Sequence, residues 1–180
     1  MRSFRDELID LVDSGVAVDY TFFWGHDRLS QKSCLSQWYE APFMVDNKVF
    51  KTAEHYMMWR KARMFDEEAA YDVLVAPTPR EAKAIGRKVR NFDDSAWDAV
   101  KFDVVVQGNI AKFSTHAVLR DFLVGTGDSV LVEASPYDRV YGIGMDARDK
   151  RALDPRKWNG ENLLGFALMT TRQILAGNLA

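Results

Sequence analysis

The segment from Thr52 to Arg63 restricts the fold more than any other part of the sequence. Thr52 is a good helix cap, and the four side chains from Tyr56 to Trp59 are all large and mainly apolar. Consecutive residues point in different directions around a helix axis, so a helix with this unbroken row is apolar on most sides. We therefore expect it to be buried inside the protein.

The same helix carries an acid and an amine. Glu54 lies in the first turn, where the helix dipole favours a carboxylate, and Lys61 follows on the same face, about 10 Å further along the axis. Such pairs are common on solvated helix surfaces, but two long side chains placed in this way could also bracket a sugar-sized group. Burial of the helix favours the second interpretation, since a buried charge needs a partner.

Capping residues and helical spacing predict further helices along the chain. They cover about residues 3–15, 66–74, 78–89, 96–113, 115–125 and 163–176. Strands are predicted at 18–24 and 129–134, and a hairpin at 42–50 turns on Asp46 and Asn47, which tolerate left-handed backbone. Residues 27–40 have no clear period and read as an irregular connection.

Length and composition limit the class of protein. A chain of 180 residues, 47% of them apolar, is most simply one domain that spans 1–180. The net charge of −2 argues against a protein that holds nucleic acid mainly by bulk electrostatics, so we expect small-molecule partners. Cys34 is the single cysteine, and we find neither an opening apolar signal region nor a membrane-spanning stretch, so a reducing cytoplasm fits best.

Aromatic residues gather at the end of the first predicted strand. Phe23, Trp24 and His26 surround Gly25 and could form a stacking wall for a flat ring. An aromatic strand end is also an ordinary part of a protein core. Trp97 is open to the same two interpretations, since it can be a core residue or can stack on a base beside a helix start.

The predicted helix over 78–89 is strongly basic. Thr78, Pro79 and Glu81 form a capping box with proline in the first helical position. Its basic residues either form a solvated face or include a phosphate contact, for which Arg87 is the candidate because a partner can approach closely at Gly86.

A glycine-containing loop follows the predicted strand over 129–134. Asp138 in this loop is either a turn carboxylate or part of a site, and the paired Gly142 and Gly144 would let the backbone approach a ligand. The Gly-Xaa-Gly pattern alone does not make a dinucleotide fingerprint.

Several short blocks, in this order and spacing, resemble the YbiA-like family, also called NADAR, whose members hydrolyse N-glycosidic bonds. The resemblance extends from about 22 to 175 and leaves 1–17 as an N-terminal helical extension. Its carriers are Phe23-Trp24-Gly25, Leu35-Ser36-Gln37-Trp38-Tyr39 with Pro42-Phe43, Ala53-Glu54-His55-Tyr56 with Lys61-Ala62, Gly86-Arg87, Trp97, Tyr137-Asp138 with Gly142-Ile143-Gly144, and Trp158-Asn159-Gly160 with Asn162-Leu163-Leu164-Gly165.

The resemblance implies an α+β fold, mostly helical with a small β-sheet, and an active site shared between the Glu54 helix and the loop from Asp138 to Gly144. The residues of these blocks that we expect to bind substrate are Phe23, Trp24, Gly25, Arg87, Trp97, Tyr137, Gly142, Gly144, Trp158 and Asn162. Trp24 and Trp97 would stack on the base, and Arg87 would hold a phosphate.

The chemistry of an N-glycosidic bond suggests two routes. Cleavage develops oxocarbenium-like charge on the sugar and needs a proton on the departing nitrogen, for which Glu54 and Asp138 are the candidates. A buried amine offers a second route through an imine, with Lys61 as the nucleophile. No metal or cofactor is required, and the three histidines lack metal-ligand spacing.

Three functions fit the family. The first is an N-glycosidase acting on ribosylamino-pyrimidine 5′-phosphates, the early intermediates of riboflavin biosynthesis. The second is a glycohydrolase that removes ADP-ribose from a base such as guanine, and only this one involves nucleic acid. The third is a non-catalytic module that binds nucleotides or ADP-ribose. We expect a small phosphoribosyl or ADP-ribosyl substrate and no membrane partner, and the sequence specifies no oligomeric state.

Overall fold

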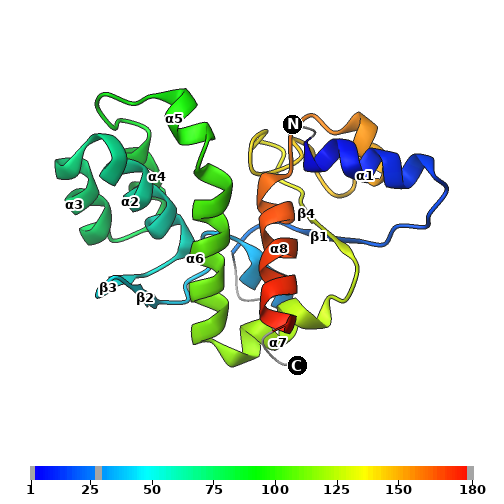
Figure 1. The fold of residues 1–180 in the computed structure, drawn as a ribbon, viewed down its shortest axis with the longest axis horizontal. Helices are drawn as coiled ribbons and strands as arrows, with labels where there is room; N and C mark the ends of the chain where they lie inside the picture. Colours follow the sequence, from blue (N-terminus) through cyan, green and yellow to red (C-terminus); the bar gives the residue numbers. More distant parts are fainter. Residues whose placement is uncertain (1–2, 27–29, 178–180) are drawn as a thin grey trace.

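The computed structural model describes residues 3–26 and 30–177 and has the expected α+β fold, mostly helical with little sheet (Figure 1). Its helices are α1 (Phe4–Asp13), α2 (Ala53–Phe65), α3 (Glu67–Val75), α4 (Pro79–Gly86), α5 (Asp94–Asp98), α6 (Lys101–Thr115), α7 (Ala117–Gly125) and α8 (Leu163–Gly177). Its strands are β1 (Tyr20–Phe23), β2 (Phe43–Val45), β3 (Lys48–Phe50) and β4 (Val130–Glu133). Short 3₁₀ turns are η1 (Gln31–Leu35), η2 (Lys150–Leu153) and η3 (Pro155–Lys157). Within the described ranges, no helix is long and apolar enough to cross a membrane.

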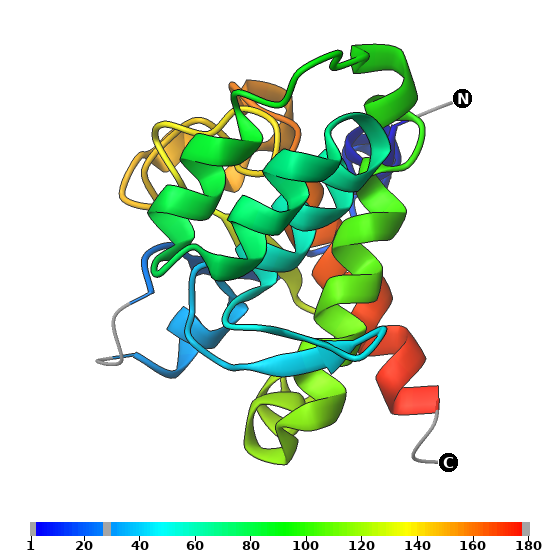
Figure 2. The same ribbon diagram turned by 90° about the vertical axis from the view of Figure 1, so that its left-hand side faces the viewer.

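The long helices α6 and α8 run side by side through the middle of the molecule (Figure 1). The helices α2, α3 and α4 pack on one another to one side of α6, with the β2–β3 hairpin beneath them in Figure 2. On the other side, β4 packs on α8 and pairs with β1. The expected burial of α2 is confirmed, because every residue from Ala53 to Trp59 is buried.

The β structure consists of two separate pairs of strands. In the hairpin, Asp46 and Asn47 both have the left-handed backbone that was predicted for the turn, with φ of 50° and 58°. The strands β1 and β4 run parallel, with Tyr20 opposite Val130 and Phe23 opposite Glu133. Their carboxyl ends therefore lie together, and the residues that follow each strand meet at one edge.

One predicted helix is wrong in its extent. The span 96–113 is divided into α5 and α6, because the N–H of Val100 donates to the Trp97 carbonyl three residues back (3.1 Å) and Val100 has non-helical backbone angles. Trp97, Val100 and Val104 keep helical spacing across the break, so periodicity could not reveal it. The helix predicted over 78–89 also ends early, at Gly86.

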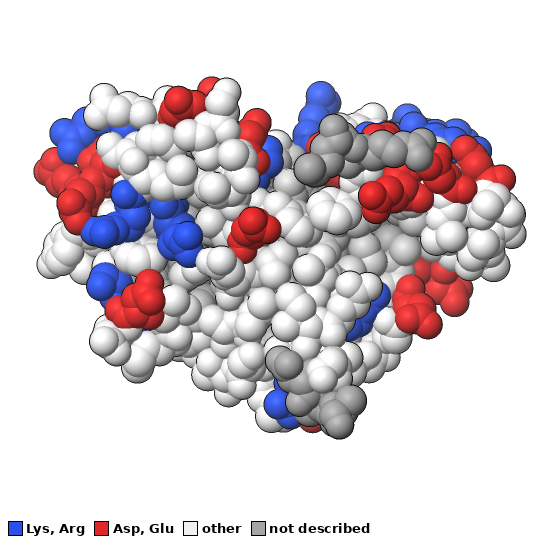
Figure 3. All heavy atoms as spheres, viewed as in Figure 1, with Lys and Arg blue, Asp and Glu red and all other residues white. Residues whose placement is uncertain are grey.

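The surface carries both signs of charge. On the face seen in Figure 3, acidic and basic side chains are interspersed towards the edges, and uncharged side chains cover much of the middle. On this face, the described residues do not form a broad positively charged surface of the kind that binds nucleic acid mainly through its phosphates.

The N-terminal helix is attached to the rest of the chain by specific contacts. The Phe4 ring stacks on Phe102 of α6, with ring centroids 4.6 Å apart. The Arg5 guanidinium donates to the carbonyl oxygens of Pro155 (2.9 Å) and Trp158 (2.8 Å). The extension therefore holds the loop that leads into α8.

At Gly165 the helix α8 packs directly against the backbone of β4, and this contact provides a test of the fold. A Cβ at this position would overlap the carbonyl oxygen of Leu131. We expect Gly165→Ala to lower the free energy of unfolding by about 2–4 kcal/mol, because neither backbone can move without repacking. Urea denaturation measures the loss. Gly125→Ala, where a Cβ meets nothing within 4 Å, is the control and should change stability by less than about 1 kcal/mol.

Candidate active site

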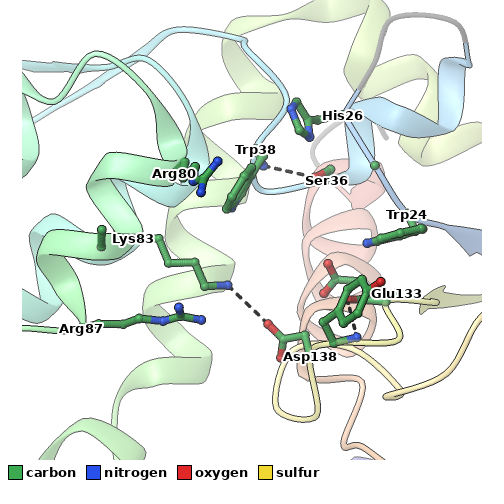
Figure 4. A pocket seen from close by; sticks show the side chains of 13 residues that line it. Trp24, His26, Ser36, Trp38, Arg80, Lys83, Arg87, Glu133 and Asp138 are labelled. Carbon is green, nitrogen blue, oxygen red and sulfur yellow. Dashed lines mark hydrogen bonds and ion pairs between the residues drawn. The ribbon is translucent and has the colours of Figure 1, made fainter.

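A cavity of about 680 Å³ lies between α4 and the carboxyl ends of β1 and β4; we call it the first cavity (Figure 4). Lys83 of α4 and Arg87, the residue directly after α4, reach into it towards Asp138 on the opposite side. The lining residues are Trp24, Gly25, His26, Ser36, Trp38, Arg80, Lys83, Ala84, Arg87, Glu133, Ser135, Tyr137 and Asp138.

Glu54 is held beside this cavity by the start of α2. The Thr52 hydroxyl caps the helix, and the N–H of Glu54 donates to the Gln37 carbonyl oxygen (2.9 Å). The Glu54 side chain is only 2% exposed, and among the described residues its Oε1 has no hydrogen-bond partner. Burial raises the pKa of Glu54 to about 7, although the charge of Lys83 and a hydrogen bond from Trp38 act in the opposite direction.

Glu133 is a second, half-buried carboxyl, which we did not single out from the sequence. It ends β4 and lines the first cavity, and its Oε2 also lacks a partner in the described part of the chain. Burial and the nearby Asp138 charge raise the pKa of Glu133 to about 8. Glu133 therefore carries its proton at neutral pH and can donate it. The available signal was an acid at the end of an otherwise apolar strand.

Lys83 is the basic residue whose charge acts most on these two acids. Its Nζ is 3.5 Å from Oδ2 of Asp138, and its charge lowers the pKa of both Glu54 and Glu133. The other oxygen of Asp138 accepts from the N–H groups of Val140 (3.0 Å) and Tyr141 (2.8 Å). Asp138 is thus both a turn carboxylate and part of the cavity, which combines the two interpretations of its sequence.

Exposed aromatic rings flank the opening. Trp24 is 54% exposed and Tyr137 is 87% exposed, with ring centroids 6.1 Å apart. Such rings can stack on a flat base. Phe23, by contrast, is 3% exposed and belongs to the core.

A second cavity of about 400 Å³ adjoins the first and shares Lys83, Arg87, Tyr137 and Asp138 with it. Lys61 and Trp97 line this second cavity. The Nζ of Lys61 lies 3.9 Å from the Phe92 ring centroid, and burial lowers its pKa. Lys61 lines only the second cavity, whereas Lys83 lines both and is the lysine whose charge acts most on Glu54.

The other expected binding residues line neither cavity. The Asn162 amide donates to the Leu131 carbonyl oxygen and accepts from the N–H of Glu133 (both 2.9 Å), which fixes the end of β4. Gly142 passes close to the Glu133 backbone, where a Cβ would come within 2.9 Å of the carbonyl oxygen. Gly144 has a φ of 65° and donates its N–H to the Asp138 carbonyl. Trp158 is buried and bonded to the Ala152 carbonyl oxygen.

Comparison with known proteins gives consistent matches. The family model of the NADAR domain matches residues 22–176. N-glycosidase R617 of Acanthamoeba polyphaga mimivirus is 37% identical over 161 residues, which cover 86% of this chain and 95% of that protein. Riboflavin biosynthesis protein PYRR, chloroplastic, of Zea mays is 34% identical over 142 residues, covering 74% of this chain and 21% of that protein.

A solved structure agrees as well. The NMR structure of the Escherichia coli protein YbiA superposes with a TM-score of 0.73 at 29% identity, covering 91% of this chain and 89% of that one. The resemblance recognised in the sequence is therefore confirmed: the chain belongs to the NADAR domain family.

Proposed function

We propose that this protein is an N-glycosidase that hydrolyses ribosylamino-pyrimidine 5′-phosphates, intermediates of riboflavin biosynthesis, and releases ribose 5-phosphate. The observation that carries the proposal is the set of three carboxyls around one amine, in and beside a cavity with an aromatic opening. The names of the relatives support N-glycosyl hydrolysis, and the maize relative supports a substrate from riboflavin biosynthesis.

The carboxyls can divide the chemistry between them. Glu133, protonated at neutral pH, donates a proton to the departing base nitrogen. Glu54, which titrates near pH 7, takes a proton from the attacking water, and the Asp138 carboxylate stabilises positive charge on the sugar.

An imine route uses the same groups with an amine as the nucleophile. Lys83 first passes a proton to the Glu54 carboxylate; the free amine then attacks the anomeric carbon, the bond to the base breaks, and the base nitrogen takes the proton from Glu133. The bound amine returns one proton to Glu133 and passes another to the ring oxygen as the sugar ring opens, which gives the imine. Water then hydrolyses the imine to free sugar and amine. The sequence suggested Lys61 for this role, but Lys83 is better placed because it lies beside all three carboxyls.

The second cavity favours one alternative function. Three basic residues and a tryptophan line it, which would suit a second nucleotide half; they are Lys61, Arg87, Lys101 and Trp97. The alternative is therefore a glycohydrolase that removes ADP-ribose from a base such as guanine. A non-catalytic binding module is less consistent with two carboxyls that each keep one buried oxygen without a partner among the described residues, since such groups are costly without a function.

A comparison of substrates tests this choice. Specificity constants are measured for the ribosylamino-pyrimidine phosphate and for ADP-ribosylated guanosine, both free and within DNA. We expect the first substrate to be preferred, and Arg87→Ala to raise its KM by an amount that corresponds to about 1–3 kcal/mol through a lost charge-assisted phosphate contact.

Lys88→Ala is the matched control, because Lys88 is the next residue along, is exposed, and lines neither cavity. A tenfold preference for ADP-ribosylated DNA, with strong salt dependence, would support the alternative instead. Tight binding of either compound without turnover would support the binding module.

A further inference from the structure

Lys112 is a completely buried lysine that lies outside both cavities. It belongs to α6 and has an exposed fraction of 0%. Its Nζ donates to the carbonyl oxygens of Cys34 (2.6 Å) and Ser36 (3.0 Å), and the Phe113 ring centroid is 5.0 Å away. The amine therefore connects α6 to a segment that is more than seventy positions away in the sequence.

A lysine in this position needs a physical reason. Burial disfavours the charged amine and lowers the pKa of Lys112 to about 7. Two backbone carbonyl groups offset this cost: that of Cys34, near the end of η1, and that of Ser36, directly after η1, both accept hydrogen bonds from the buried amine. A buried carbonyl without a donor is costly, and a long amine can reach two at once.

The same helix makes a second contact with the same segment. The side-chain amide of Asn109, one turn before Lys112, donates to Oε1 of Gln37 (3.1 Å). The Gln37 carbonyl oxygen in turn accepts the N–H of Glu54, and the Ser36 hydroxyl accepts the N–H of Trp38 (3.2 Å). The segment 34–38 thus joins α6 to the start of the Glu54 helix, and two of its own residues, Ser36 and Trp38, line the first cavity.

We propose that Lys112 is a positioning residue: by holding the carbonyl groups of Cys34 and Ser36, it fixes the segment 34–38 and, through it, Glu54 and Trp38. The proposal rests on the proposed function only where activity is measured. Lys112 touches no substrate and takes no part in the chemical steps. The groups that would respond to a movement of Glu54 are the charges and hydrogen-bonding groups around it, which are Trp38, Lys83, Arg87, Glu133, Asp138 and Tyr141.

Lys112→Met tests the proposal, since methionine keeps most of the volume and removes the donor. We expect kcat to fall about tenfold or more with KM changed less than about threefold, because Glu54 acts in the chemical step. The apparent pKa of the acidic limb should move towards the ordinary value of a carboxyl by about half a unit, as Glu54 becomes better solvated. The Glu54 amide should exchange with solvent about tenfold faster, while amides of α8 keep their rates.

Two controls separate positioning from general loss of stability. Lys32→Met removes an exposed lysine from η1, on the solvent side of the same region, and should change none of these readouts. Leu175→Ala destabilises α8 by opening a cavity and should lower the unfolding midpoint without shifting the pH profile or selectively speeding exchange at Glu54.

Wild-type kinetics, pH profile and Glu54 exchange in Lys112→Met would overturn the proposal. If that variant does not fold, Asn109→Ala removes the second contact with the same segment. It should lower kcat and speed exchange at the Glu54 amide by about threefold each, and it should move the acidic limb of the pH profile in the same direction. Exchange at Glu54 is read without any substrate, so a failed N-glycosidase assay would contradict the proposed function and leave the positioning role decided by exchange alone.

Discussion

Replacing Lys83 with methionine is expected to reduce kcat by about 10³-fold or more if the reaction passes through an imine. The reason is that methionine cannot attack the anomeric carbon, and it leaves Asp138 without the partner that lies 3.5 Å away. Borohydride added during turnover should trap a sugar adduct on the wild-type protein, and mass spectrometry should locate it on Lys83.

Lys61→Met is the matched control. It removes a second partly buried amine from the adjoining cavity. We expect it to raise KM while leaving the trapped adduct on Lys83. An adduct on Lys61 would instead support the nucleophile that the sequence suggested. Hydrolysis that continues in Lys83→Met, with no adduct on either lysine in the wild type, would indicate direct attack by water.

Glu54→Gln and Glu133→Gln should each reduce kcat by about 10²–10⁴-fold and should remove opposite limbs of the pH profile. Because burial raises the pKa of Glu54 to about 7 and that of Glu133 to about 8, the wild type should be most active between these values. Loss of the Glu54 proton creates the base, and loss of the Glu133 proton removes the acid. The two groups interact, so the limbs report macroscopic pKa values.

The same shifts predict how stability depends on pH. Each of these carboxyls binds its proton more tightly in the folded protein than in the unfolded chain, where a pKa near the usual 4.5 applies. The stabilising contribution is complete below about 4.5 and is lost as the pH rises through about 7 to 8. Both glutamine variants should therefore unfold at a higher temperature than the wild type at pH 9. An equal or lower midpoint would mean that the carboxyls are solvated.

Local features of the sequence predicted much of the fold. Thr52, Asp66 and Thr78 each cap a helix as expected, and the Asp46 and Asn47 turn forms with the predicted backbone. These signals are short-range, because a cap or a turn acts within three or four residues. The burial of α2 could also be read locally, from its unbroken run of large side chains.

The site depended on contacts that no local pattern contains. Glu133 reaches the cavity because β4 pairs with β1, and Lys83 looked like one of several basic residues on a solvated face. Glu54 and Lys61 do share a helix, but Lys61 lines the second cavity, whereas Glu54 is buried where the charges of Lys83 and Asp138 act on it. Spacing along one helix fixed their separation, whereas the packing of α4 decided which amine lies beside the carboxyls.

The parallel pairing of β1 with β4 also bears on the order in which the protein folds. Tyr20 pairs with Val130, 110 positions later, so this contact closes a very long loop, and its entropic cost must be met before the pairing contributes. The helices α2, α3 and α4 are neighbours in sequence and can pack early. The first cavity needs both groups of elements, with Lys83 from the early part and Glu133 from the late part. The ability to bind substrate should therefore appear last during refolding, after most of the helical signal has recovered.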